Sequence, residues 1–365
     1  MTAALFFAGI NFWMLYTSVK LPLSAYLGLC WLAIVWVLAY FSGLSSGYVS
    51  PDEVFFATKS IDNFFSNRTL WLAINQLTGL FTENVIETMR VLNFGFVILI
   101  YITAVRTFIT LHPLFLAFAL SYASCVAAFN FRDLAILLGV ILFLDHRTKY
   151  GHSLADQLRV AINSKWILSY LFLLRPIQAV LLWASGLRWY LLAGGMVLTI
   201  AFLQTQLGST YFYNFSYYTQ NFNEAVSDKA EDKGFKSTQP TPRNIAFCTA
   251  RFILAPSPMS VAQRVASGGG TYSYGLFDLS VRFTSRLAIY LLFMALLYYA
   301  LRVPRITFDT FRANSFALKF GMLFSVLYAV FNFGASHERI KMIILVLAIF
   351  MVDRVRREYF SKMAR

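Results

Sequence analysis

Apolar runs that are long enough to cross a lipid bilayer recur along this chain, from its first residues to its last twenty. A spanning helix needs about 20 largely apolar residues, and shorter runs suffice where their flanking side chains reach the interface. Hydrophobic residues make up 58% of the 365 positions and charged residues only 13%. A water-soluble domain needs about 25% charged residues to cover its surface. The sequence therefore predicts an all-α, polytopic membrane protein.

We expect about eleven transmembrane helices, which would make residues 1–365 a single membrane domain. Proline at the Arg175-Pro176 step removes a helix hydrogen bond and favours a kink or a re-entrant hairpin between two short spans. The expected spans lie near 2–18, 21–41, 91–110, 113–130, 134–144, 166–175, 177–187, 188–204, 287–302, 315–334 and 339–353.

Basic residues in short loops predict the orientation, because such loops stay in the cytoplasm. The C-terminal tail after residue 353 is rich in arginine and lysine, so it is expected inside, and eleven spans then place the N-terminus outside. The same threading sends residues 42–90, with amphipathic stretches over 53–66 and 70–82, and the large loop 205–286 to the outer face. Within that loop, residues 224–239 are expected to be solvated.

The net charge of +14 does not point to nucleic acid, because no basic helix, zinc spacing or aromatic RNA-binding motif accompanies it. Cys30, Cys125 and Cys248 are too few and too scattered for a disulfide framework or a metal site. There is no Walker loop, no dinucleotide-binding glycine pattern, no HExxH and no nucleophile elbow. We therefore expect no cofactor, no metal ion and no nucleic-acid partner.

Arginines at the outer membrane boundary are the strongest candidates for ligand binding. Arg132 stands between two apolar runs beside Asp133, and Arg175 and Arg339 occupy similar boundary positions. The guanidinium presents a rigid fork of donors that matches phosphate oxygens, so these side chains suit a pyrophosphate at headgroup level. Each can equally be an interfacial arginine that only reaches toward lipid headgroups. If they share one ligand, they converge in space.

Four further residues complete the candidate site. Asp52 and Glu53 could act as general base toward a sugar hydroxyl, ligate a divalent metal through oxygen, or form the acidic first turn of a surface helix after Pro51. His337 lies near Arg339 and can accept a proton near neutral pH. Arg251 lies in the large outer loop, where the stretch after residue 249 returns to an apolar pattern and is expected to dock on the membrane domain.

Several of these segments, in this order, resemble the polysaccharide polymerases of the Wzy and EpsG-like group. Asp52 with Phe55, Phe56 and Ile61-Asp62 is similar to their D-x-x-Y-x-x-Y pattern, although phenylalanines replace the tyrosines. The corner Arg132-Asp133-Leu134-Ala135 resembles their R-Q-x-L-A segment. The stretch from Arg251 to Pro258 resembles an arginine and P-x-P element in the long outer loop of some polymerases.

This resemblance implies an inverting glycosyl transfer on the outer face of a bacterial cytoplasmic membrane. The donor would be a glycan on undecaprenyl pyrophosphate and the acceptor a lipid-linked repeat unit, with a chain-length regulator as a further candidate partner. One alternative is a GT-C type polyprenyl-phosphate-sugar glycosyltransferase, in which Asp52 and Glu53 form the catalytic acidic pair. Another is a lipid or oligosaccharide transporter, although the paired half-sequences typical of transporters are not evident.

Overall fold

The computed structural model describes residues 21–45, 49–61, 68–148, 164–187, 242–267, 275–332 and 338–364, and these residues form helices and no strands. This confirms the all-α prediction for the described part of the chain. The chain divides into two compact units. The first unit comprises Met1–Ala179, Ser257–Asn314 and Glu338–Arg365, and the second comprises Val180–Pro256 and Ser315–His337.

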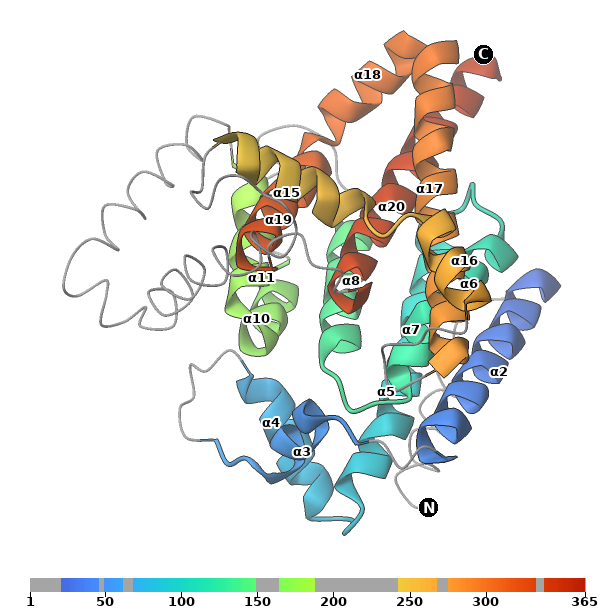
Figure 1. The fold of residues 1–365 in the computed structure, drawn as a ribbon. Coiled ribbons are helices and arrows are strands. Elements are labelled where there is room, and N and C mark those ends of the chain that lie inside the picture. The colour runs from blue at the N-terminus through green and yellow to red at the C-terminus, as the bar shows by residue number, and fades with distance from the viewer. Residues whose placement is uncertain are drawn as a thin grey trace. The chain divides into compact units, whose positions relative to one another are not determined.

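Three described helices are long and apolar enough to cross a membrane, and all belong to the first unit (Figure 1). They are α2 (Leu23–Ser45), α5 (Val85–Thr107) and α17 (Gly275–Arg302). On α2 and α17, large apolar side chains such as Leu27, Ile34 and Met294 are exposed. The expected spans 2–18 and 188–204 lie outside the described residues. Eleven spans therefore stay a prediction.

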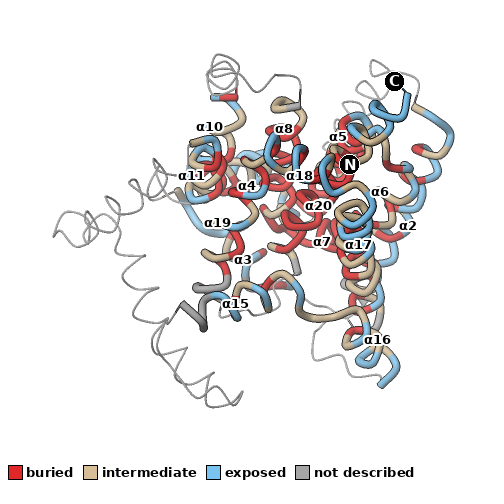
Figure 2. The backbone as a smooth tube through the Cα atoms, turned by 90° about the horizontal axis from the view of Figure 1, so that it is seen from above, coloured by how far each residue is buried: buried red, intermediate tan, exposed pale blue. Residues whose placement is uncertain are grey.

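The centre of the first unit is built by α20 (Glu338–Met363), α8 (Asp133–Thr148) and α7 (Ser121–Ala127). Every residue of α20 from Lys341 to Asp353 is buried, as expected for a helix that is surrounded by other helices. Figure 2 shows the buried segments gathered on these helices and exposed stretches along α2 and α17.

The single span expected over 113–130 is divided into α6 (Pro113–Ala119) and α7, with a break at Leu120. Ser121 provides the physical reason. Its hydroxyl donates to the carbonyl of Ala117 at 3.1 Å and accepts from the indole N–H of Trp31 at 2.8 Å. A serine that bonds back to the carbonyl four residues earlier bends a helix. The helix pair therefore turns where a straight span was predicted.

The break at Arg175 is confirmed. Helix α10 (Lys165–Leu174) ends before it and α11 (Pro176–Ser185) begins after it, while Arg175 itself is extended, with φ −161° and ψ 93°. Helix α10 lies close against α8 at Gly139, where an added Cβ would come within 2.5 Å of the Leu171 side chain. Tyr170 also donates to the carbonyl of Ala135 at 2.9 Å. These contacts fix the start of α8 beside the end of α10.

Two short helices correspond to the predicted amphipathic stretches. They are α3 (Pro51–Thr58) and α4 (Thr69–Gly79), and they lie together beside the N-terminal end of α5 (Figure 1). In the expected large loop, α16 (Pro258–Ala266) packs on α17, which begins at Gly275 rather than after residue 286. The part of the loop over 224–239 lies outside the described residues.

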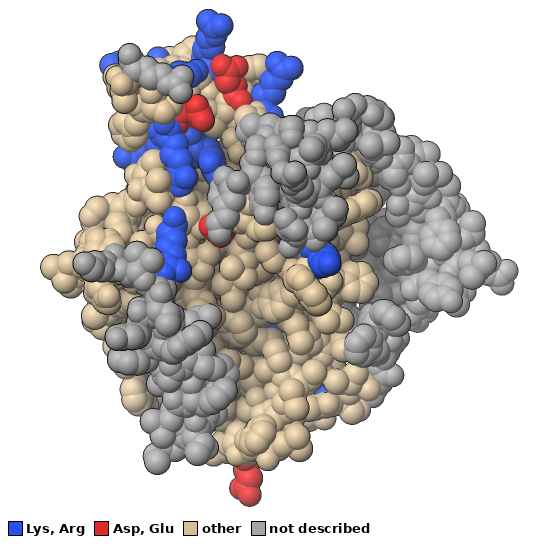
Figure 3. Space-filling model, turned by 180° about the vertical axis from the view of Figure 1, so that it is seen from behind, with Lys and Arg blue, Asp and Glu red and all other residues tan. Residues whose placement is uncertain are grey.

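Basic side chains gather at one end of the first unit, where α17 ends, α18 (Pro304–Ala313) follows and α20 finishes (Figure 3). Here Asp353 of α20 accepts hydrogen bonds from the backbone N–H and the hydroxyl of Thr110, at 2.9 and 2.8 Å. Arg357 pairs with Asp353 at 2.7 Å and donates to the carbonyl of Thr107. These bonds fasten α20 to the C-terminal end of α5.

In the second unit, α15 (Pro242–Leu254) packs along α19 (Ser315–Asn332). The ring of Phe252 is fully buried and stacks on Tyr328, with ring centroids 6.2 Å apart. Lys319 donates to the carbonyl of Leu187 at 2.6 Å, which satisfies one of the last carbonyls after α11.

Candidate functional site

Two of the three predicted boundary arginines pair with the same carboxylate. Asp133, in the first turn of α8, lies 3.8 Å from Nη2 of Arg175 and 3.8 Å from Nη1 of Arg339. Arg175 comes from the break between α10 and α11, and Arg339 from the first turn of α20. Three segments that are far apart in the sequence thus bring their charges to one place.

Arg132 lies at the same corner but is engaged differently. Its side chain is buried, and Nη1 donates to the carbonyl of Leu174 at 3.0 Å. Leu174 is the last residue of α10 and directly precedes Arg175. Arg132 therefore fastens the start of α8 to the end of α10, and it helps to position the two arginines that surround Asp133.

Asp52 extends this group on the other side of Arg339. Its Oδ2 lies 3.7 Å from Nη2 of Arg339, and the guanidinium of Arg339 also rests over the ring of Phe131 at 4.0 Å. The order Arg175, Asp133, Arg339, Asp52 gives alternating charges, and we call these four side chains the charge chain. Arg175 and Asp133 form its buried end, with side chains that are 16% and 13% exposed, and the exposure rises to 31% for Arg339 and 51% for Asp52.

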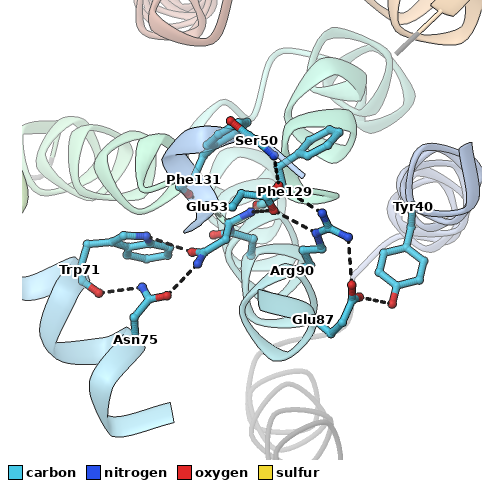
Figure 4. A network of polar contacts seen from close by, with 11 residues as sticks. Tyr40, Ser50, Glu53, Trp71, Asn75, Glu87, Arg90, Phe129 and Phe131 are labelled. Carbon is cyan, nitrogen blue, oxygen red and sulfur yellow. Dashed lines mark hydrogen bonds and ion pairs between the residues drawn. The ribbon is translucent and has the colours of Figure 1, made fainter. Parts of the chain in front are cut away.

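Glu53, the neighbour of Asp52, has no exposed surface. Its two oxygens accept from Nε and Nη2 of Arg90, at 2.9 and 3.1 Å, and from the backbone N–H groups of Ser50 and Asn130, at 2.9 and 2.8 Å (Figure 4). The bond to Ser50 closes a capping box at the start of α3. Four hydrogen bonds occupy this carboxylate, so it anchors α3 to α5 and to the turn before α8.

The same network holds the turn that carries Phe131 and Arg132 (Figure 4). Asn93 donates to the carbonyls of Phe129 and Phe131, at 2.6 and 3.0 Å. The amide of Asn130 accepts from the indole of Trp71 and donates to Asn75. Because this turn leads directly into α8, these buried bonds determine where Asp133 stands.

Arg90 was missed by the sequence analysis. It lies in α5 and bonds Glu53 across a separation of 37 residues, and it also donates to Glu87 at 3.0 Å. Glu87 in turn accepts from the hydroxyl of Tyr40 at 2.5 Å. The sequence placed Arg90 at the end of the outer segment 42–90, directly before the span expected over 91–110, whereas α5 begins at Val85 and includes it. No local pattern in the sequence identifies Glu53 as its partner.

A second buried charge cluster was also missed, on the first half of α17. Asp278 pairs with Arg282 at 2.7 Å, Arg282 lies over the ring of Tyr122, and Arg286 is fully buried. These three residues follow one another at intervals of four, which places them on one face of a helix. That spacing is a signal that a search for i, i+4 charge pairs would have found.

Two predicted site residues are not joined to the charge chain. His337 lies outside the described residues. Arg251 belongs to α15 of the second unit, one turn after Cys248. Burial raises the pKa of the Cys248 thiol, and the positive charge of Arg251 acts in the opposite direction.

Comparisons of the chain with known protein families, with curated proteins and with solved structures find no match. The function is therefore inferred from the geometry of the site. It offers a cationic site with three arginines against two aspartates, a partly exposed carboxylate at its edge, and a rigid buried network behind it. Such a site suits an anion of more than one charge, with a nearby base.

Proposed function

We propose that this protein is a membrane-embedded polysaccharide polymerase similar to the Wzy and EpsG-like group. It would transfer a glycan from an undecaprenyl-pyrophosphate donor to a lipid-linked repeat unit at the outer face of the bacterial cytoplasmic membrane. Arg175 and Arg339 would hold the pyrophosphate, Arg132 would position them, and Asp52 would accept the proton of the attacking hydroxyl.

The observation that carries the proposal is the meeting of Arg175 and Arg339 at Asp133. Like charges repel, so two guanidinium groups from distant segments share a place only where something anionic compensates them. Asp133 lies between the two arginines, and Asp52, the second carboxylate beside Arg339, is half exposed. A diphosphate with a lipid tail is an anion that fits a cationic site at the end of apolar helices.

Embedding in a bilayer rests on the three long apolar helices and on the distribution of charge. Large apolar side chains are exposed along most of α2 and on the C-terminal half of α17, which suits contact with lipid. The basic end of the first unit carries Arg302, Arg305, Arg312 and Lys362, all exposed. By the positive-inside rule this end faces the cytoplasm, and the charge chain then faces outward.

Topology gives the first test. A reporter fused after Arg357 should read cytoplasmic, and one inserted at Asp232 should read extracytoplasmic, because an odd number of spans lies between them. Paired alkaline phosphatase and green fluorescent protein fusions measure this directly. Both reporters on the same side of the membrane would contradict the orientation.

The structure weighs against the GT-C alternative, which needs Asp52 and Glu53 to act together on the substrate. Glu53 is fully buried and holds four hydrogen bonds, so it cannot reach a substrate without breaking the network that anchors α3. Asp52 alone remains as an accessible carboxylate of the pair. An inverting displacement of pyrophosphate requires a single base and does not require an acidic pair.

Reconstitution tests the reaction itself. The purified protein in liposomes, supplied with one lipid-linked repeat unit, should form a ladder of longer glycans without nucleotide, and a metal chelator should leave the ladder unchanged. Gel separation of the released glycans gives the readout. Activity that appears only with a polyprenyl-phosphate monosaccharide and a divalent metal would support the GT-C alternative instead.

A further inference from the structure

We propose that Asp52 is an internal occupant of the anion site, which the donor's diphosphate displaces and thereby frees to act as the base. This inference rests on the proposed function and adds its regulation. The base would be paired with Arg339 while the site is empty and released only when a donor is in place. The hydroxyl of the acceptor would then be activated only after the donor's diphosphate has bound to the anion site.

The ion pairs around Arg339 in the charge chain are long. The separations of 3.7 and 3.8 Å around Arg339 exceed the length of a hydrogen bond between nitrogen and oxygen. At these distances the carboxylates neutralise Arg339 without closing its donor fork. By contrast, Arg90 donates to Glu53 at 2.9 and 3.1 Å in a bidentate pair. Arg90 is therefore fixed by its carboxylate partner, whereas Arg339 can exchange its carboxylate partner for a different anion.

Arg339 is also held by an aromatic contact that does not involve Asp52. Its guanidinium rests over the ring of Phe131 at 4.0 Å. Phe131 belongs to the turn that Asn93 holds through two backbone carbonyls. A cation over an aromatic face is stabilised independently of any carboxylate. Arg339 can therefore stay in place while its anionic partner is exchanged.

The two aspartates of the charge chain are not equivalent. Asp133 is shared by two arginines and its side chain is only 13% exposed, so it stays and orients both. Asp52 is the terminal member of the charge chain, and half of its side chain faces outward. A diphosphate with at least two negative charges attracts Arg175 and Arg339 more strongly than one exposed carboxylate does. Asp52 is therefore the carboxylate that the diphosphate displaces from Arg339.

The step balances without any further reactant. The freed Asp52 carboxylate takes the proton of the acceptor hydroxyl as that oxygen bonds to the anomeric carbon of the donor. The bond from this carbon to the pyrophosphate oxygen breaks, and the electron pair leaves on the diphosphate, where the arginines stabilise it. When the lipid diphosphate departs, Asp52 gives its proton to water and pairs with Arg339 again.

The test uses inorganic pyrophosphate as probe and measures its binding to the full-length purified protein by titration calorimetry. Asp52→Asn keeps the shape and removes the competing charge, so affinity should rise by about 1.5- to 5-fold, the range expected for an exposed ion pair. The same variant should lose polymerisation in liposomes. Asp309→Asn is the matched control, because Asp309 is exposed on α18 and its replacement changes the net charge equally. It should change neither quantity.

The outcomes separate this inference from the proposed function. Tighter binding in Asp52→Asn and unchanged binding in Asp309→Asn support the displacement. If the unaltered protein binds pyrophosphate but Asp52→Asn binds it equally or less tightly, displacement is wrong and the anion site stands. If polymerisation persists in Asp52→Asn, this residue is not the base. If the unaltered protein binds no pyrophosphate, both the displacement and the anion site fail.

Discussion

Replacing Glu53 with alanine should destabilise the protein by about 3–5 kcal/mol, because the partner of a buried ion pair is left without compensation. Arg90 would keep its charge in a buried position, with Glu87 on the part-exposed side as its remaining ion pair and the ring of Phe129 at 5.7 Å. The N–H groups of Ser50 and Asn130 would lose their acceptor as well. Thermal unfolding of the detergent-solubilised protein, followed by intrinsic fluorescence, measures the loss.

Asp52→Ala provides the matched control for this stability measurement. This substitution removes the acidic side chain next to Glu53. Because Asp52 is half exposed and its pair with Arg339 is long, the free energy of unfolding should fall by less than about 1 kcal/mol. A melting temperature of Glu53→Ala equal to that of the unaltered protein would show that the network around Arg90 does not anchor α3. A large loss in both variants would point to the start of α3 itself.

Replacing Arg175 or Arg339 with alanine should lower the polymerisation rate by about 100- to 1000-fold, the cost of removing a preorganised donor from a developing anion. Lysine at either position should also impair the reaction, because a point ammonium retains the charge but not the bidentate fork. Initial rates of ladder formation in liposomes give the comparison, at equal amounts of folded protein.

Arg312→Lys and Arg312→Ala are the matched controls, because Arg312 is an exposed arginine at the basic end of the first unit. Both should polymerise at the normal rate. Arg132 is expected to behave differently from Arg175 and Arg339. Its donor contacts the carbonyl of Leu174, so Arg132→Lys should lower stability together with activity. Full polymer length in Arg175→Lys and Arg339→Lys would overturn the pyrophosphate site.

The sequence was sufficient to predict features that depend on local chemistry. The helical class follows from the apolar runs, and the break at Arg175 follows from the proline that comes after it. Boundary arginines could be named because charge is costly next to an apolar run. Their common partner Asp133 was visible only as the neighbour of Arg132, since its pairs with Arg175 and Arg339 are made by folding.

Other features depend on pairings that no sequence window contains. Glu53 and Asp52 have the same local pattern, and only the position of Arg90 on α5 makes one an anchor and leaves the other accessible. The Ser121 hydroxyl that bends the chain at Leu120 bonds locally to Ala117, but it is also held by Trp31 across 90 residues. The starting point of α17 at Gly275 was missed because its first turns carry Asp278 and Arg282, charges that balance each other within the helix.

The attachment of Asp353 and Arg357 to Thr110 and Thr107 has a consequence for the far end of the same helix. Helix α20 runs without interruption from Arg339 to Asp353, about 21 Å at 1.5 Å per residue. A helix is stiff along its axis, so the hydrogen bonds at Thr110 set the axial register of α20 as a whole. A slip of one residue at the basic end would carry Arg339 along by about 1.5 Å and turn it away from Phe131 and Asp133. The hydrogen bonds at the basic end of the first unit thus set the alignment of Arg339 at the opposite end of α20.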